Sequence, residues 1–121
     1  MTPMKRLLLM LGAAFAVVVV TAHTETSDGK SLFEKRCSGC HSLDHDKEGP
    51  RLGGVYGRAA GSVASFNYSD ALKSTHITWD AASLDKWLAG PDKFVPESDM
   101  AFHVESATER GAIIAYLKEV R

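Results

Sequence analysis

The chain contains 121 residues, which is enough for one domain of ordinary size and too few for two domains with separate cores. Its 14 basic and 15 acidic residues give a formal charge of −1. This balance excludes the strongly basic surface that nucleic-acid binding requires, so we expect no nucleic-acid partner.

Residues 1–22 are typical of a signal peptide for export. Lys5 and Arg6 precede an almost continuous apolar run, and small residues up to Ala22 suit cleavage. The 16 residues from 7 to 22 are fewer than the roughly 20 that span a membrane, which favours a cleaved signal over an uncleaved anchor. Cleavage would leave 12 basic and 15 acidic residues, a formal charge of −3. We therefore expect a periplasmic protein, with attachment to the inner membrane facing the periplasm as the alternative.

The segment after the predicted signal begins with a short polar tail, residues 23–27, so we expect the domain to span residues 28–121. A first helix is predicted from Asp28, because apolar side chains recur at helical spacing up to Cys37. Residues 42–66 are rich in glycine and charged side chains, which predicts an irregular loop.

Three further helices are predicted, at residues 69–74, 80–89 and 106–119. Asp80 is a suitable N-cap for the second of these, and Gly90-Pro91 ends it. Pro96 predicts that residues 92–102 form no regular secondary structure. Because no apolar alternation is long enough for a sheet, the expected fold class is all-α, with long loops around a central group.

The motif C-x-x-C-H, formed by Cys37, Cys40 and His41, carries the chemistry. It is the pattern for covalent haem attachment, because on a helical turn all three side chains lie on one side. Two thioethers would then hold the ring while the imidazole binds the iron. The alternatives are a thioredoxin-like disulfide, which lacks its strand–helix unit, and half of a zinc site, which lacks its other ligands.

A low-spin haem iron needs a second axial ligand, which methionine or histidine can supply. Beyond the predicted signal the only methionine is Met100, in the irregular stretch after Pro96. His103 is the competing ligand, since it lies three residues further on. A methionine is commonly core filler, and the residues alone leave both ligands open.

Ordered stretches along the chain resemble class I cytochrome c of the mitochondrial and α-proteobacterial cytochrome c2 type, over about residues 28–121. They are GPRLGGVYGR (49–58), FNYSDA (66–71), ITW (77–79), LAGP (88–91), FVPESDMAF (94–102), TER (108–110) and AYLK (115–118). The resemblance implies short helices and loops wrapped around one covalent haem c. It also implies that Met100 joins His41 as an axial ligand of the haem iron.

The resemblance assigns roles to further residues of the site. The Pro50 carbonyl would accept a hydrogen bond from the outer nitrogen of His41 and so orient the ring. Arg58, Tyr68 and Trp79 would hold the haem propionates as hydrogen-bond donors.

The function implied is single-electron transfer by a monomer that is not an enzyme. Its partners would be membrane redox complexes of the respiratory chain, a bc1-type donor and a terminal oxidase or other reductase as acceptor, in transient docking. The alternatives are a haem peroxidase or small-gas-binding cytochrome with a labile Met100, suggested by an altered turn at residues 103–105, or a membrane-anchored electron carrier. Trp87 replaces the tyrosine usual near the methionine, and acidic residues weaken the lysine ring expected around the haem edge.

Overall fold

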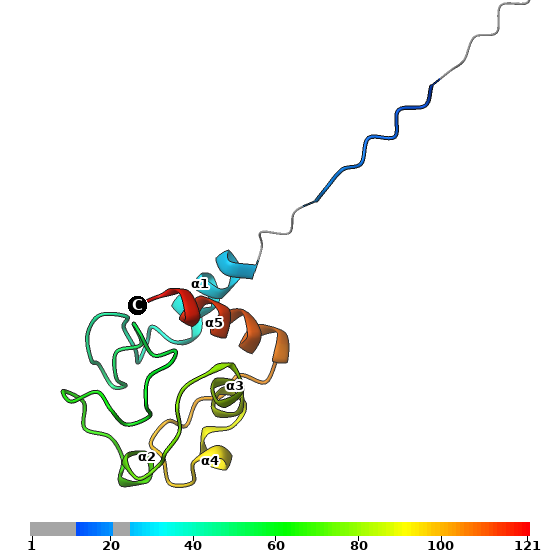
Figure 1. The fold of residues 1–121 in the computed structure, drawn as a ribbon. Coiled ribbons are helices and arrows are strands. Elements are labelled where there is room, and N and C mark those ends of the chain that lie inside the picture. The colour runs from blue at the N-terminus through cyan, green and yellow to red at the C-terminus, as the bar shows by residue number, and fades with distance from the viewer. Residues whose placement is uncertain (1–11, 21–24) are drawn as a thin grey trace, which may run out of the picture.

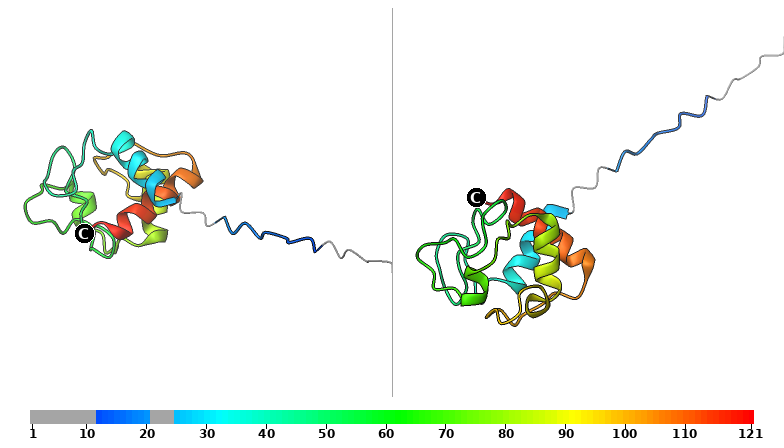
Figure 2. Two further views of the ribbon diagram at one scale, coloured as in Figure 1. Left: turned by 90° about the horizontal axis from the view of Figure 1, so that it is seen from above. Right: turned by 60° about the horizontal axis from the view of Figure 1, so that its bottom comes forward.

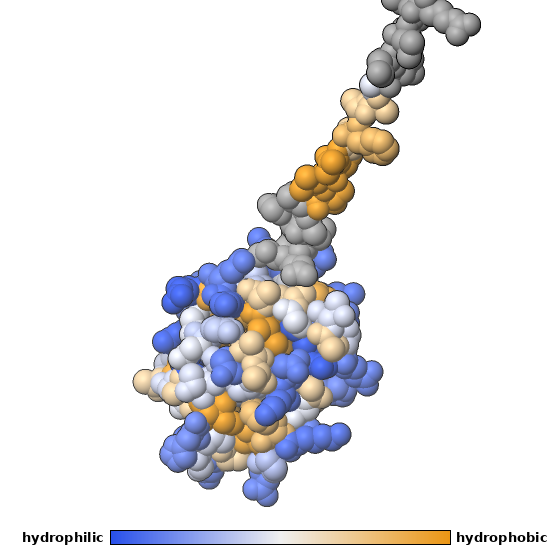
Figure 3. All heavy atoms as spheres, turned by 45° about the vertical axis from the view of Figure 1, so that its right-hand side comes forward, coloured by the Kyte–Doolittle hydropathy of each residue, from blue (hydrophilic) through white to orange (hydrophobic). Residues whose placement is uncertain are grey.

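The computed structural model describes residues 12–20 and 25–121. The start of the predicted signal, its cleavage position after Ala22 and the first residues of the predicted tail lie outside the described residues. Residues 12–20 have no regular secondary structure, and their apolar side chains, orange in Figure 3, are exposed. In the described ranges, no helix is both long and apolar enough to span a membrane.

Five helices make up the regular structure of residues 25–121 (Figure 1). They are α1 (Glu25–Arg36), α2 (Asp70–Lys73), α3 (Ala81–Ala89), α4 (Pro91–Phe94) and α5 (Ala107–Glu119). The described part of the chain holds no strand, and its extended segments meet only at an isolated bridge between Ala59 and Thr78. The all-α prediction is therefore confirmed.

The first and last helices pack directly against each other, as both views of Figure 2 show. Contact is possible because Gly29 of α1 lacks a Cβ, which would overlap the backbone carbonyl of Ala112 in α5. Beside this point the rings of Phe33 and Tyr116 lie 5.5 Å apart at 53°. Ile113 is completely buried beneath them. This crossing brings the two ends of the domain together and closes one side of the core.

Side-chain caps set the beginnings of the later helices where the sequence predicts them. The Asp80 carboxylate accepts a hydrogen bond from the Ser83 amide (2.8 Å), and the Ser83 hydroxyl accepts one from the Asp80 amide (2.9 Å). At α5 a single bond serves as the cap, because the Ser106 hydroxyl oxygen accepts a hydrogen bond from the Glu109 amide (3.2 Å). These bonds satisfy amides that have no partner inside the helix.

Two predicted boundaries are wrong. Helix α1 begins at Glu25, within the predicted tail, and not at Asp28. The sequence predicts no regular structure for residues 92–102, but α4 occupies Pro91–Phe94. Proline suits the first helical position because its missing amide has no role there and its φ is already helical. Pro96 therefore prevents a helix only after α4 has ended.

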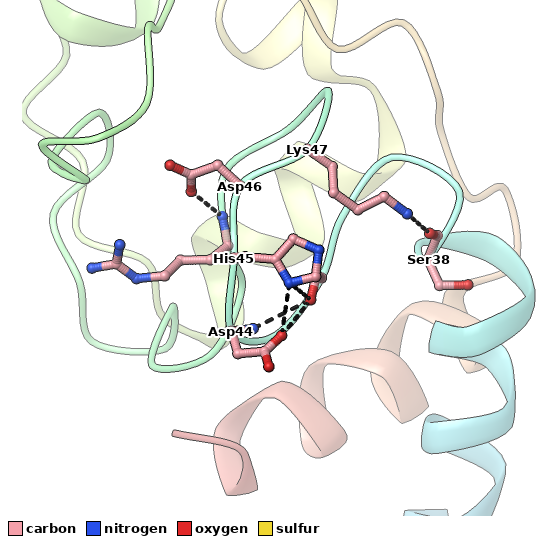
Figure 4. A network of polar contacts seen from close by, with 7 residues as sticks. Ser38, Asp44, His45, Asp46 and Lys47 are labelled. Atoms are coloured by element: carbon pink, nitrogen blue, oxygen red, sulfur yellow. Dashed lines mark hydrogen bonds and ion pairs between the residues drawn. The ribbon is translucent and has the colours of Figure 1, made fainter.

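The long loop after His41 is held by its own side chains (Figure 4). The Asp46 carboxylate accepts hydrogen bonds from the Ser65 hydroxyl (2.6 Å) and the Arg51 amide (2.9 Å). Lys47 donates to the Ser38 carbonyl (2.7 Å). These bonds order an irregular segment that has no helix to stabilise it.

Candidate functional site

A cavity of about 490 Å³ lies between the long loop and helices α3 and α5. Its lining is mainly apolar and includes Val55, Leu84, Leu88, Ile113 and Leu117. The lining also contains every site residue that the sequence predicted, namely Cys37, Cys40, His41, Pro50, Arg58, Tyr68, Trp79 and Met100. An apolar cavity with a few convergent polar groups is typical of a cofactor site.

Cys37, Cys40 and His41 share one side of the cavity because the backbone continues to turn after α1. The Cys37 amide donates to the Phe33 carbonyl (2.8 Å), and the His41 amide donates to the Cys37 carbonyl (2.9 Å). Residues three and four positions apart therefore lie side by side. This is the arrangement that two thioethers and an axial imidazole require.

The His41 ring is held in one orientation and one tautomer. Its Nδ1 lies 2.8 Å from the Pro50 carbonyl oxygen, and since a carbonyl only accepts, Nδ1 carries the proton. Burial lowers the pKa of His41, the bond to Pro50 opposes this shift, and the nearby charges of Arg58 and Lys47 lower the pKa further. A neutral ring protonated at Nδ1 leaves the Nε2 lone pair available for iron.

Gly49 supports the same ring, although sequence reasoning assigned it no role. A Cβ at this position would overlap the His41 imidazole, so the backbone packs flat against the ring. The Gly49 amide also donates to the Cys40 carbonyl (2.8 Å). Gly49 therefore holds the imidazole at its face, and Pro50 holds it at Nδ1. In the sequence the same Gly-Pro pair looks like an ordinary turn.

The surroundings of Cys37 do not favour the reactive pair of a disulfide oxidoreductase. Burial raises the pKa of the Cys37 thiol to about 11. Catalytic dithiols have a lowered pKa, because the thiolate is the nucleophile. A zinc site is also unsupported, since the described ranges contain no group of three metal-binding side chains.

Polar donors face the cavity from Arg58 and Tyr68. Arg58 donates to the carbonyls of Arg51 (2.8 Å) and Gly53 (3.4 Å), but its buried Nε has no partner. Burial lowers the pKa of this guanidinium, which stays charged. The Tyr68 oxygen accepts from the Val63 amide (3.1 Å), so its own proton remains available. These donors fit an anionic group such as a propionate.

Two tryptophans form the wall beside these donors. Trp79 and Trp87 lie 5.5 Å apart at 56°, and both are nearly buried while lining the cavity. Trp79 thus lines the same cavity as the other predicted site residues, and its role toward a haem propionate stays a prediction. Trp87 from α3 adds a large apolar surface and one indole donor, and it cannot accept a hydrogen bond.

Met100 reaches the cavity from the segment between α4 and α5, where it is half-buried. The next residues are anchored, because Val104 is 1% exposed and its amide donates to the Leu88 carbonyl (2.7 Å). His103, the competing ligand, is exposed, does not line this cavity and lies 3.6 Å from Glu105. The structure therefore brings Met100, and not His103, to the predicted site.

Arg110 holds this segment in place and was also missed from the sequence. Its Nε lies 2.7 Å from the Asp85 carboxylate, and its Nη1 donates to the carbonyls of Val104 (2.9 Å) and Glu105 (2.7 Å). The Arg110 side chain is 12% exposed. One guanidinium thus joins α3, α5 and the chain that follows Met100.

Comparisons with known proteins agree with this geometry. The sequence matches the cytochrome c family over residues 26–121. It is 44% identical to cytochrome c of Euglena viridis, covering 77% of this chain and 94% of that protein. Cytochrome c of Arabidopsis thaliana is 36% identical, with 85% and 96% covered. Among solved structures, cytochrome cH from Methylobacterium extorquens is similar, with a TM-score of 0.73, 40% identity, and 77% of this chain and 96% of that chain covered. The chain therefore belongs to the class I cytochrome c family, whose members carry one covalent haem c and its iron.

Proposed function

We propose that this cytochrome c carries single electrons in the periplasm, with His41 and Met100 as the two axial ligands of the haem iron. Members of the family are electron carriers and not enzymes. The observation that carries the proposal is that one apolar cavity is lined by both side chains, which come from separate segments. When bound, the haem supplies a one-electron couple between ferrous and ferric iron.

The residues of the chain have distinct tasks in this proposal. Cys37 and Cys40 would hold the haem through thioethers, and His41 would present Nε2 because Nδ1 is bonded to Pro50. Arg58 would donate to a propionate from its unpartnered Nε, together with Tyr68 and Trp79. The apolar walls of the cavity would keep water away from the haem iron, so the surroundings would reorganise little when its charge changes.

The alternative function, in which Met100 dissociates so that peroxide or a small gas binds iron, depends on a loosely held segment after Met100. Residues 103–105 are instead tied to α3 and α5 through the Val104 amide and the Arg110 guanidinium. Such anchoring supports a permanent methionine ligand and hence the carrier.

Visible spectroscopy of the ferric holoprotein tests the ligand assignment. We expect a methionine-to-iron charge-transfer band at neutral pH, and we expect Met100→Ala to abolish it. His103→Ala is the matched control and should retain the band, since His103 lies outside the cavity lining. A band that His103→Ala removes, or ferric iron that binds cyanide rapidly in the unaltered protein, would contradict the proposal.

The periplasmic location is tested by the mass of the mature protein after expression of the full chain in a bacterium. A mature N-terminus at His23 in the periplasmic fraction is expected. Retention of residues 1–22 in the membrane fraction would instead support the anchored carrier.

The proposed partners are a bc1-type donor and a terminal oxidase or other reductase as acceptor. We expect the ferric protein to be reduced by a purified bc1-type complex at a rate that saturates with cytochrome concentration. Reduction no faster than the uncatalysed background would contradict this choice of donor.

A further inference from the structure

The chain makes a tight turn shortly before Met100, over Val95, Pro96, Glu97 and Ser98. The Ser98 amide donates to the Val95 carbonyl (3.2 Å), which closes a four-residue β-turn. Proline occupies the second position of the turn, and Glu97, at the third position, has a φ of 66°. A proline followed by a residue of positive φ is the pattern of a type II turn, whose third position is normally glycine or asparagine.

Glu97 is therefore a strained residue. In residues 12–20 and 25–121 it is the one residue other than glycine with a positive φ. In this left-handed region the Cβ of a side chain crowds the backbone, and glutamate has no short polar group to offset the cost as asparagine does. The Glu97 side chain is exposed and forms no ion pair with the residues that the structure describes. Its conformation is thus imposed by the chain on either side.

The chain is anchored before and after the turn. Before it, the Val95 amide donates to the Pro91 carbonyl (2.8 Å), and Val95 is 5% exposed. After Met100, the Val104 amide is bonded to the Leu88 carbonyl. Between these two fixed points the φ of the strained residue decides the direction in which the backbone continues toward Met100. The strain therefore acts on the segment that presents the proposed axial ligand.

Met100 has space on both sides. Besides the haem cavity it lines a second hollow of about 350 Å³, bordered also by Gly90, Lys93 and His103. Of these residues Lys93 and His103 are exposed, so this hollow faces the surface. A Met100 side chain that leaves the haem cavity can thus move into the hollow without displacing the buried core.

We propose that Glu97 is a positioning residue that sets how firmly Met100 is held as a ligand of the haem iron. With Met100 in the haem cavity the turn is strained, and relaxation of Glu97 to a negative φ would direct Met100 toward the second hollow. The strain lowers the preference for the ligated form only by the difference in strain between the two forms, so ligation is weakened and retained. This inference rests on the proposed axial role of Met100.

Displacement of Met100 by imidazole measures the effect. The ferric holoprotein is titrated with imidazole while the methionine-to-iron charge-transfer band is followed. For Glu97→Gly we expect half of the band to be lost at an imidazole concentration about fivefold higher than in the wild type, because glycine accepts a positive φ without strain. Glu97→Asn should shift the midpoint in the same direction by a smaller factor, and it provides the test if the glycine variant does not fold.

Two controls separate backbone strain from charge and from flexibility. Glu97→Ala removes the carboxylate but keeps the Cβ, so its midpoint should lie within about twofold of the wild type. Glu105→Gly makes the same glutamate-to-glycine change on the other side of Met100, where φ is not positive. Glycine relieves no strain there and adds freedom to the open chain, so the midpoint should not rise.

Equal midpoints for Glu97→Gly and Glu97→Ala, or a rise for Glu105→Gly as large as that for Glu97→Gly, would overturn the role of Glu97 while leaving the carrier function intact. Absence of the band from the unaltered protein, or its survival in Met100→Ala, would instead refute the axial role of Met100 and this inference with it.

Discussion

Replacing Arg110 with glutamine should loosen the segment that presents Met100 without touching the haem cavity. The guanidinium makes three hydrogen bonds, one to the Asp85 carboxylate and two to backbone carbonyls. Glutamine cannot span these acceptors and carries no charge. Val104 is only 1% exposed. In the variant its backbone carbonyl would lose the charged hydrogen-bond donor that Arg110 supplies.

The expected loss follows from the exposure of each partner. Asp85 is 48% exposed, so its ion pair contributes no more than about 1 kcal/mol. The bond to the buried Val104 carbonyl contributes about 1.5 kcal/mol, and that to the exposed Glu105 carbonyl contributes less. Arg110→Gln should therefore lower the free energy of unfolding by about 3 kcal/mol. In a domain of this size, that lowers Tm by roughly 10–20 °C.

Thermal unfolding of the ferric holoprotein measures this change. The methionine-to-iron band should disappear before the far-ultraviolet circular dichroism changes, because the segment after Met100 loses its anchor first. Lys30→Gln is the control, because Lys30 is an exposed cation on α1 that forms no ion pair within residues 25–121, and this variant should unfold with the wild type. A Tm for Arg110→Gln within 3 °C of the wild type, or simultaneous loss of both signals, would refute the reasoning.

Three other predictions follow from single residues. Gly49→Ala would place a methyl group into the His41 ring, so spectroscopy should show a displaced or lost axial histidine, and an unchanged spectrum would contradict this. Gly111→Ala meets no atom within 4 Å and should stabilise α5 by about 0.5–1 kcal/mol in denaturant unfolding. The Ser65 hydroxyl and the Arg51 amide lower the pKa of Asp46. Stability from Asp46 is thus present above its unfolded pKa and lost as the pH falls through the folded pKa. Asp46→Asn should therefore destabilise near neutral pH and approach the wild type in acid, and a deficit independent of pH would contradict this.

Sequence patterns predicted the later helices well because their caps are local. Asp80 and Ser106 each bond an amide three positions ahead, so the residues that decide the boundary are adjacent in the chain. The error at α4 has an equally local cause. Pro96 predicts an interruption of helical structure, but Pro91 lies earlier in the same stretch and begins α4 at its first helical position.

The candidate site could be predicted where its chemistry lies in a motif. All eight predicted residues line one cavity, and their roles in binding haem stay predictions. Gly49 and Arg110 could not be predicted, because their roles depend on backbone atoms. Gly49 matters because it has no Cβ, which would overlap the His41 ring. Arg110 donates to two backbone carbonyls, and the sequence of side chains does not show which way a carbonyl points.

The crossing of α1 and α5 has a consequence for how the protein is made. The Arg36–Glu109 bond at this crossing joins residues 73 positions apart, so it closes only after nearly the whole chain is available. The thiols of Cys37 and Cys40 follow α1 and emerge from synthesis long before Ile113 and Leu117, which complete the cavity wall. In the proposed role of Cys37 and Cys40, haem would reach both cysteines while the chain is still open, and the attached ring would then offer an apolar surface against which α5 packs.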